Sequence, residues 1–142
     1  MQFRKYANRK RVRLGSFTTR EWRLKQTMHE LSICQALIAQ VEKIAMDHKA
    51  QSVESIILKI GPLAGIEALL LQHAYPFACA GTVAAHSKLV IELAALKISC
   101  EACGTETEAE PNRLICDACG SHHTTIVSGD EMMLMSVELI TS

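Results

Sequence analysis

The stretch that decides the fold is Cys100-Glu101-Ala102-Cys103-Gly104, which is matched further on by Cys116-Asp117-Ala118-Cys119-Gly120. Each half places two thiols three positions apart, and the glycine after the second thiol permits the positive φ with which such a turn closes. Twelve residues separate Cys103 from Cys116, a spacing typical of a four-cysteine zinc site. Since four thiolates in a tetrahedron suit Zn²⁺, the sequence predicts structural zinc at Cys100, Cys103, Cys116 and Cys119.

Two other uses of these cysteines are less consistent with the chain. Disulfides need an oxidising compartment, for which nothing in the sequence argues, and a redox CxxC pair would not need a duplicate. A four-cysteine site has no open position, so the predicted zinc folds the region and does not catalyse. The remaining thiols, Cys34 and Cys79, lie in apolar helical segments and are predicted to pack in the core.

Composition bounds the size and class of the protein. A chain of 142 residues can hold one ordinary domain, or a small core plus a metal-stapled module. No stretch reaches the roughly 18 apolar residues of a transmembrane helix, so we expect a protein without a membrane span. The net charge of zero hides a split, because residues 1–27 hold 9 basic residues and 1 acidic residue. Residues 28–142 hold the other 6 basic and 14 acidic residues, so the two parts carry +8 and −8.

The basic segment 1–27 has three interpretations. It could be a disordered arm that touches nucleic acid, an arginine-rich transit peptide, or an artefact of a native protein that starts at Met28. It lacks an apolar core, which excludes a secretory signal. We favour a dispensable or artefactual tail, because organised sequence begins abruptly at Met28.

Two segments have the apolar periodicity of a helix. The first covers residues 31–48 and the second covers about 66–80. Pro76 removes one backbone donor, so it should kink or weaken the last turns of the second helix. The expected buried residues are Cys34, Leu37, Ile38, Val41 and Ala45 in the first helix and Ile66, Leu69, Leu70, Ala74 and Phe77 in the second.

Three segments read as strands, at residues 53–60, 88–96 and 131–140. Their predicted inward faces are Ile56, Leu58 and Ile60, then Leu89, Ile91 and Leu93, and last Met133, Met135, Val137 and Leu139. The fold class is therefore α+β. Two helices cover a three-stranded sheet built from residues 28–98 plus 129–142, and a zinc-ribbon-like module at 99–128 is inserted between two strands.

The start of the organised chain is a candidate metal site. If the chain began at Met28, a free amine would stand beside the imidazole of His29 and the backbone nitrogens of His29 and Glu30. Four nitrogens in a plane suit Ni²⁺ or Cu²⁺, although this short motif alone is weak.

An ordered set of motifs resembles the hydrogenase-maturation nickel chaperones of the HypA/HybF family, and it covers essentially all of residues 28–142. The motifs are Met28-His29-Glu30-Leu31-Ser32-Ile33-Cys34, Leu58-Lys59-Ile60-Gly61-Pro62-Leu63, Gly65-Ile66-Glu67, Gly81-Thr82, the double CxxC, Gly129-Asp130-Glu131 and Ser136-Val137-Glu138.

This resemblance implies a small α/β nickel domain and a zinc module. It implies nickel held by the Met28 amine, by His29 through imidazole and amide nitrogens, and by the Glu30 amide nitrogen. Such proteins are not enzymes: they hand nickel to the large subunit of a [NiFe]-hydrogenase with a GTPase partner, HypB, and in some organisms they also serve urease. We accordingly expect a cytoplasmic metallochaperone. The 27-residue extension departs from the family, because it would turn the Met28 amine into an amide and remove one ligand.

Two other function classes remain open. A zinc-ribbon nucleic-acid-binding module could use residues 1–27 as its arm, but a body at −8 argues against a basic groove. A thiol oxidoreductase would need a reducible pair of low pKa, which bound zinc would block. Of the remaining histidines, His122 and His123 are expected in an exposed loop, His73 partly buried with a partner, and His48 at the end of the first helix. The sequence does not decide whether the protein dimerises.

Overall fold

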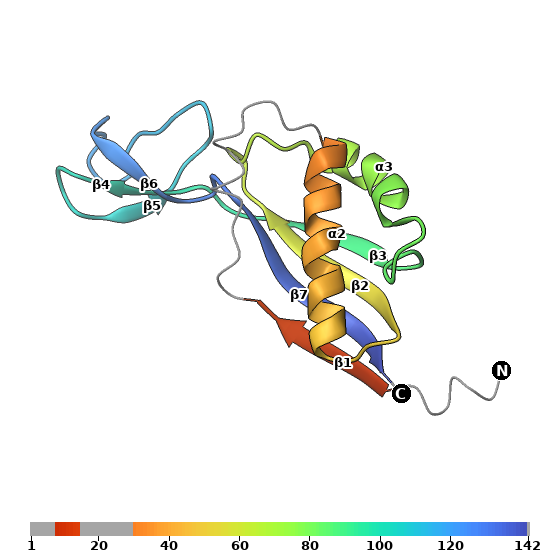
Figure 1. Ribbon diagram of the computed structural model, residues 1–142. Helices are drawn as coiled ribbons and strands as arrows, with labels where there is room; N and C mark the ends of the chain where they lie inside the picture. Colours follow the sequence, from red (N-terminus) through yellow and green to blue (C-terminus); the bar gives the residue numbers. More distant parts are fainter. Residues whose placement is uncertain (1–7, 15–29, 142) are drawn as a thin grey trace.

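The computed structural model describes residues 8–14 and 30–141, so Met28 and His29 lie outside the described residues. Two helices and seven strands make up this part of the chain (Figure 1). In chain order they are β1 (Asn8–Arg13), α2 (Glu30–Asp47), β2 (Ser52–Ile60), α3 (Ala68–Cys79), β3 (Lys88–Leu93), β4 (Lys97–Cys100), β5 (Glu106–Glu108), β6 (Thr124–Ser128) and β7 (Met132–Thr141).

The larger sheet has the order β1-β7-β2-β3, and both helices lie on one of its faces (Figure 1). β2 and β3 are parallel and α3 connects them, as a crossover between parallel strands requires, while β7 is antiparallel to β1 and β2. A second sheet, β5-β4-β6, extends away from the first and carries the paired cysteines. The α+β class with an inserted four-cysteine module is therefore confirmed.

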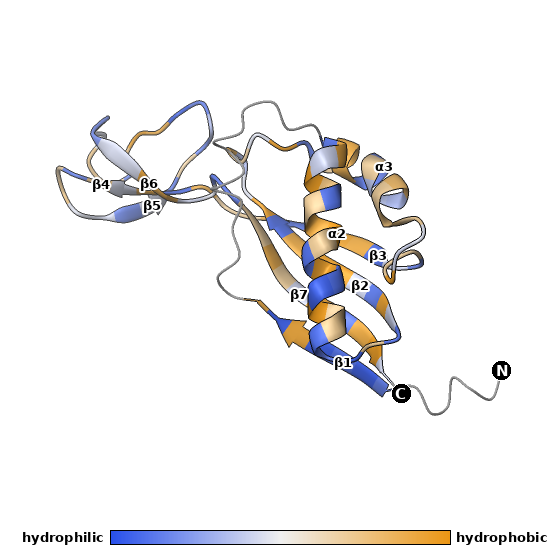
Figure 2. Ribbon diagram, viewed as in Figure 1, coloured by the Kyte–Doolittle hydropathy of each residue, from blue (hydrophilic) through white to orange (hydrophobic). Residues whose placement is uncertain are grey.

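The predicted core faces of α2 and β2 are confirmed. Cys34, Leu37 and Val41 are fully buried, as are Ile56 and Leu58 of the strand below them. Figure 2 shows that hydrophobic and hydrophilic residues alternate along α2 and that hydrophobic residues are frequent in the strands that it covers. Burying a side chain the size of leucine stabilises the fold by about 1.5–3 kcal/mol, so this layer anchors α2 along its length.

The predicted face of α3 is wrong. Leu69, Leu70 and Phe77 are exposed by 66%, 45% and 78%, whereas Leu71 and Tyr75 are buried. Nine of the twelve residues of this helix are apolar or aromatic, and they point in most directions around it, so periodicity alone does not select a face. They are Ala68, Leu69, Leu70, Leu71, Ala74, Tyr75, Phe77, Ala78 and Cys79. Tertiary contacts select the buried face. One of them is the hydrogen bond that the side-chain amide of Gln72 donates to the Leu89 carbonyl at 3.2 Å. The helix also continues through Pro76 to Cys79.

A β-bulge corrects the predicted face of β7. Ile57 pairs with Ser136 and Leu58 pairs with Leu134, so Met135 is an extra residue in β7. The alternation therefore changes sides at this point: Met132 and Leu134 are buried, while Met133 and Met135 are only half-buried. Beyond the bulge Val137 and Leu139 are buried as predicted. In β3 only Leu89 is buried, and Leu93 is 79% exposed.

The described part of the basic extension forms a strand. Asn8–Arg13 pairs with the last strand and adds a fourth strand to a sheet expected to have three. Residues this rich in arginine lack an apolar pattern, but a strand at a sheet edge needs only backbone partners and a few contacts. Here β7 supplies the ladder, and Val12 and Leu14 pack against the core.

Candidate metal centres

The two cysteine pairs form two similar turns at the far end of the smaller sheet. The N–H of Gly104 donates to the Cys100 carbonyl at 2.9 Å, and the N–H of Gly120 donates to the Cys116 carbonyl at 2.8 Å. Both glycines have positive φ, 74° and 76°, which L side chains rarely adopt. The local sequence therefore shapes each turn so that its two thiols point to one side.

The four sulfurs fit a tetrahedral zinc ion. They all lie within 4.8 Å of one another, with Cys100 Sγ 3.5 Å from Cys119 Sγ and Cys103 Sγ 3.6 Å from Cys116 Sγ. A Zn–S bond of about 2.3 Å implies about 3.8 Å between the sulfurs of a tetrahedron. All four cysteines are free thiols, so the structure contains no disulfide among them. The structure thus brings together the four residues that the spacing predicted.

Proton affinities in the cluster differ between neighbouring thiols. Hydrogen bonds from Thr105 are the main cause that lowers the pKa of Cys103 to about 6. At Cys119 the Ser121 N–H lowers the pKa, but the neighbouring cysteines and burial outweigh it and raise the pKa to about 12. Thiols this close oppose each other's ionisation, and a bound dication is the group that lets all of them carry charge.

Hydrogen bonds tie the turns to the segments that follow and precede them. The Glu101 N–H donates to the His123 carbonyl at 2.8 Å, and the Thr124 hydroxyl donates to the Leu114 carbonyl at 2.9 Å. The side chains of His122 and His123 are exposed in this loop, as predicted. The cluster is therefore held by β4, β6 and the loops between them, and the backbone of His123 takes part.

A glycine contact lies at the junction where the chain returns from this module to the larger sheet. The Gly61 N–H donates to the Glu131 carbonyl at 3.0 Å, and the Leu63 N–H donates to the Gly129 carbonyl at 2.8 Å. A Cβ on Gly61 would lie 2.1 Å from the Gly129 oxygen, and a Cβ on Gly129 would lie 2.6 Å from the Leu96 Cα. The contact between the two glycines is long-range, so it left no local signal in the sequence.

The second predicted centre lies at the start of α2. Glu30 is the first residue of that helix and is half-buried, whereas Met28 and His29 are outside the described residues. An acidic residue in the first turn favours the positive end of the helix dipole. The structure therefore shows only the last residue of the predicted nickel segment, Glu30, which opens a helix whose inner face is buried.

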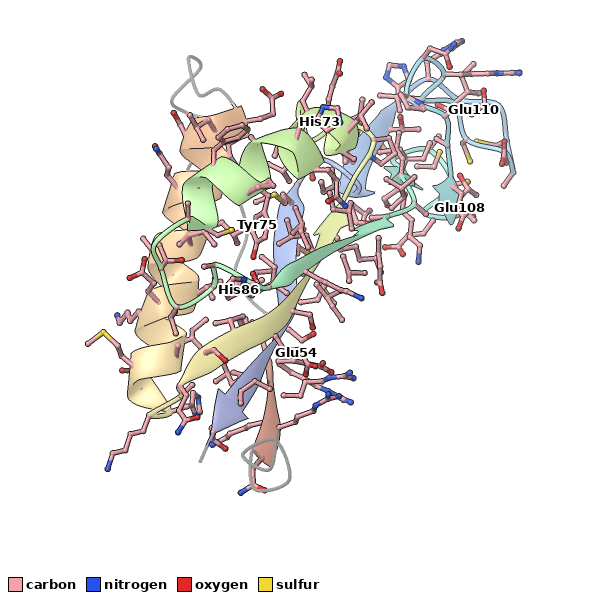
Figure 3. The ribbon with its side chains drawn as sticks, turned by 90° about the vertical axis from the view of Figure 1, so that its right-hand side faces the viewer. Glu54, His73, Tyr75, His86, Glu108 and Glu110 are labelled. Atoms are coloured by element: carbon pink, nitrogen blue, oxygen red, sulfur yellow. The ribbon has the colours of Figure 1, made fainter. Side chains whose placement is uncertain are left out.

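Two other histidines belong to the helices or directly follow them. His73 is exposed on α3 (Figure 3), so the expectation that it is partly buried with a partner is wrong. His48 directly follows α2, where Lys49 takes a positive φ of 53°. Glu106, Glu108 and Glu110 are all exposed. None of the helices in the described part of the chain has the length and apolar character needed to cross a membrane.

Comparison with known proteins adds sequence and fold relatives. Residues 28–139 match the family described as hydrogenase/urease nickel incorporation, metallochaperone, hypA. The chain is 59% identical over 115 residues to the hydrogenase maturation factor HypA of Nitrosospira multiformis. The alignment covers 81% of this chain and 100% of that protein. It is 43% identical to the HypA of Aquifex aeolicus over 79% of this chain and 97% of that protein.

A solved structure has the same fold. The solution structure of the nickel metallochaperone HypA from Helicobacter pylori superposes with a TM-score of 0.62 at 26% identity, over 81% of this chain and 100% of that one. A further solution structure of a HypA protein gives a TM-score of 0.65 at 25% identity, over 82% and 99% of the two chains. The family match begins at residue 28, so β1 lies outside it.

Proposed function

The chain belongs to the HypA family of nickel metallochaperones, and we propose that its Met28–Glu30 segment carries the Ni(II) that it delivers during hydrogenase maturation. The observation that carries the proposal is the family match, which starts at Met28 and runs through the zinc module to residue 139. The alternative of a nucleic-acid-binding module is not favoured. In the described part of the extension, Arg9 and Arg11 pair with acidic side chains of the chain's own sheet.

In a chain that starts at Met28, the proposed nickel ligands are the Met28 amine, the imidazole and amide nitrogens of His29, and the amide nitrogen of Glu30. Four nitrogens in a plane suit Ni²⁺. Support comes from the start of α2 at Glu30, because the first N–H groups of a helix have no partner inside the helix. The Glu30 nitrogen can therefore bind a metal without breaking a helical hydrogen bond. Ile33 and Cys34 bury the first turn and hold this end of the helix in place.

We assign structural zinc to Cys100, Cys103, Cys116 and Cys119. Zinc supplies a fourfold cross-link between the two turns, and a site with four protein ligands leaves no position for a substrate. The chain then divides into a nickel-binding domain, residues 28–98 plus 129–142, and a zinc module, residues 99–128. The protein acts as a carrier and not as an enzyme.

The partners we propose follow from the family. The recipient is the large subunit of a [NiFe]-hydrogenase, reached with a GTPase of the HypB type in the cytoplasm, and urease is a second recipient where it occurs. A site at the end of a helix is accessible to such partners, whereas an ion enclosed by protein would be hard to hand on.

A nickel titration of two zinc-loaded forms tests the site. One form starts at Met1 and the other at Met28 with a free amine, and binding is followed by calorimetry and by the visible spectrum of square-planar Ni²⁺. We expect one nickel on the Met28 form, loss of binding in His29→Ala, and unchanged binding in the control His73→Ala, whose imidazole is exposed on α3. Equal binding by both forms would exclude the amine as a ligand. No binding by either form would overturn the proposed site, while the zinc content would still report on the zinc module.

A further inference from the structure

The strand β1 occupies the edge of β7. Six residue pairs join them, from Asn8 opposite Thr141 to Arg13 opposite Ser136, and the Leu14 N–H donates to the Met135 carbonyl at 2.8 Å. Without β1 the order of the sheet would be β7-β2-β3, so the part of the chain that matches the family ends at β7 on this side. A long edge strand is a template for another strand.

Two carboxylates beside this edge bind arginines of β1. Arg9 forms an ion pair with Glu54 at 3.0 Å, and Arg11 Nε donates to Glu138 at 3.0 Å. The Ser55 hydroxyl donates to the other Glu138 oxygen at 3.3 Å. Glu54 is the extra residue of a bulge in β2, and its second oxygen is buried with no hydrogen-bond partner among the described residues. Figure 3 shows Glu54 on the side of the sheet away from the helices.

The other face of β1 is apolar where it meets the core. Val12 and Leu14 are half-buried and pack against the core cluster. Leu14 lines a hollow of about 220 Å³ with the apolar Ile44 and Leu134, and Gln40, Lys43 and Asp47 of α2 complete its lining. Because side chains alternate along a strand, the occupant of this edge needs cations at alternate positions on one face and apolar groups on the other.

We propose that the edge of β7, together with Glu54 and Glu138, is a docking site for an extended basic segment of a partner protein, and that β1 is its occupant in cis. The charges argue against a second copy in this role. Glu138 is the one charged residue of β7, so pairing two β7 strands would gather the carboxylates of Glu54 and Glu138 from both copies without a cation. A tethered strand has an effective concentration near the millimolar range, so β1 excludes the partner segment while it is docked. This site is separate from nickel carriage.

A peptide-binding experiment tests the proposal. The probe is a fluorescent peptide with the sequence of residues 8–14, Asn-Arg-Lys-Arg-Val-Arg-Leu, followed by anisotropy. The form that starts at Met28 is a suitable receptor, because a natural relative of similar length is matched over its whole sequence. This relative, from Nitrosospira multiformis, is covered to 100% by 81% of this chain. We expect this form to bind the peptide, and the full chain to bind it at least about tenfold more weakly. Binding should also weaken as ionic strength rises.

Two pairs of matched variants locate the site. In the Met28 form, Glu54→Gln with Glu138→Gln should weaken peptide binding several-fold. The control Glu42→Gln with Glu92→Gln removes equal charge from α2 and β3 and should not. In the full chain, Arg9→Glu with Arg11→Glu should release β1 and open the edge to the peptide, while Lys10→Glu with Arg13→Glu changes the charge equally and should leave it closed. Thermal unfolding and zinc content check that each variant is folded.

Three results would overturn the proposal. One is that the Met28 form does not bind the peptide. Another is that it binds a scrambled peptide equally well, which would show only general electrostatic attraction. The third is that light scattering finds the Met28 form as a dimer that the peptide does not dissociate, which would make a second copy the occupant.

Discussion

Replacing Gly61 by alanine should force apart the two segments that meet at the junction between the larger sheet and the zinc module. The new Cβ would lie 2.1 Å from the Gly129 oxygen and 2.2 Å from its carbonyl carbon. Real Cβ atoms essentially never lie within 3.0 Å of such a neighbour. The two segments must therefore separate by at least 0.9 Å, the difference between 3.0 and 2.1 Å. Because both partners are backbone atoms, no side-chain rotation can relieve the clash.

The magnitude follows from the bonds at this contact. Separation weakens the bonds from the Gly61 N–H to Glu131 and from the Leu63 N–H to Gly129, which measure 3.0 and 2.8 Å. A donor left without a partner costs about 1–3 kcal/mol, so Gly61→Ala should lower the free energy of unfolding by about 2–6 kcal/mol. That is a large share of the roughly 5–15 kcal/mol of an ordinary domain.

Urea denaturation of the zinc-loaded protein, followed by circular dichroism, measures this loss. Gly65→Ala is the matched control, because Gly65 has a positive φ of 73° but nothing within 4 Å of a new Cβ. It should cost about 1–2 kcal/mol through backbone strain alone. If Gly61→Ala costs no more than Gly65→Ala, the close approach of the two segments does not hold the junction and the reasoning is refuted.

Three further predictions concern zinc, pH and the face of α3. Chelating zinc, or Cys116→Ser, should disorder β4–β6 in amide spectra while α2 stays folded, and thiol reagents should react with the cluster only after chelation. The hydrogen bond from Arg11 lowers the pKa of Glu138 in the folded protein. The ionised Glu138 should therefore stabilise the fold above its ordinary pKa of 4.5, and this stabilisation should be lost as the pH falls below that value. When unfolding is measured against pH, Glu138→Gln should remove this part of the pH dependence. Leu71→Ala should cost about 2–5 kcal/mol in urea denaturation and the exposed Leu69→Ala under about 0.5, and equal costs would reject the face of α3 described above.

Local sequence determined the features that depend on neighbouring residues. The cysteine turns need only a thiol, two spacer residues, a second thiol and a glycine, so their spacing predicted a site whose sulfurs the fold brings within 4.8 Å. The periodicity of α2 predicted Cys34, Leu37 and Val41 as buried, because polar residues occupy its other side. The nickel segment was also predicted from sequence, and it remains a proposal because Met28 and His29 lie outside the described residues.

Only the tertiary structure decided the features that depend on distant partners. Helix α3 is apolar in most directions, so its contacts with β3 and α2 chose Leu71 over Leu69. The bulge at Met135 depends on the register between β7 and β2, which neither strand encodes alone. An arginine-rich segment has no apolar period, and it became a strand because β7 offers a backbone edge with carboxylates beside it. Contacts across long stretches of chain leave no local periodicity to read.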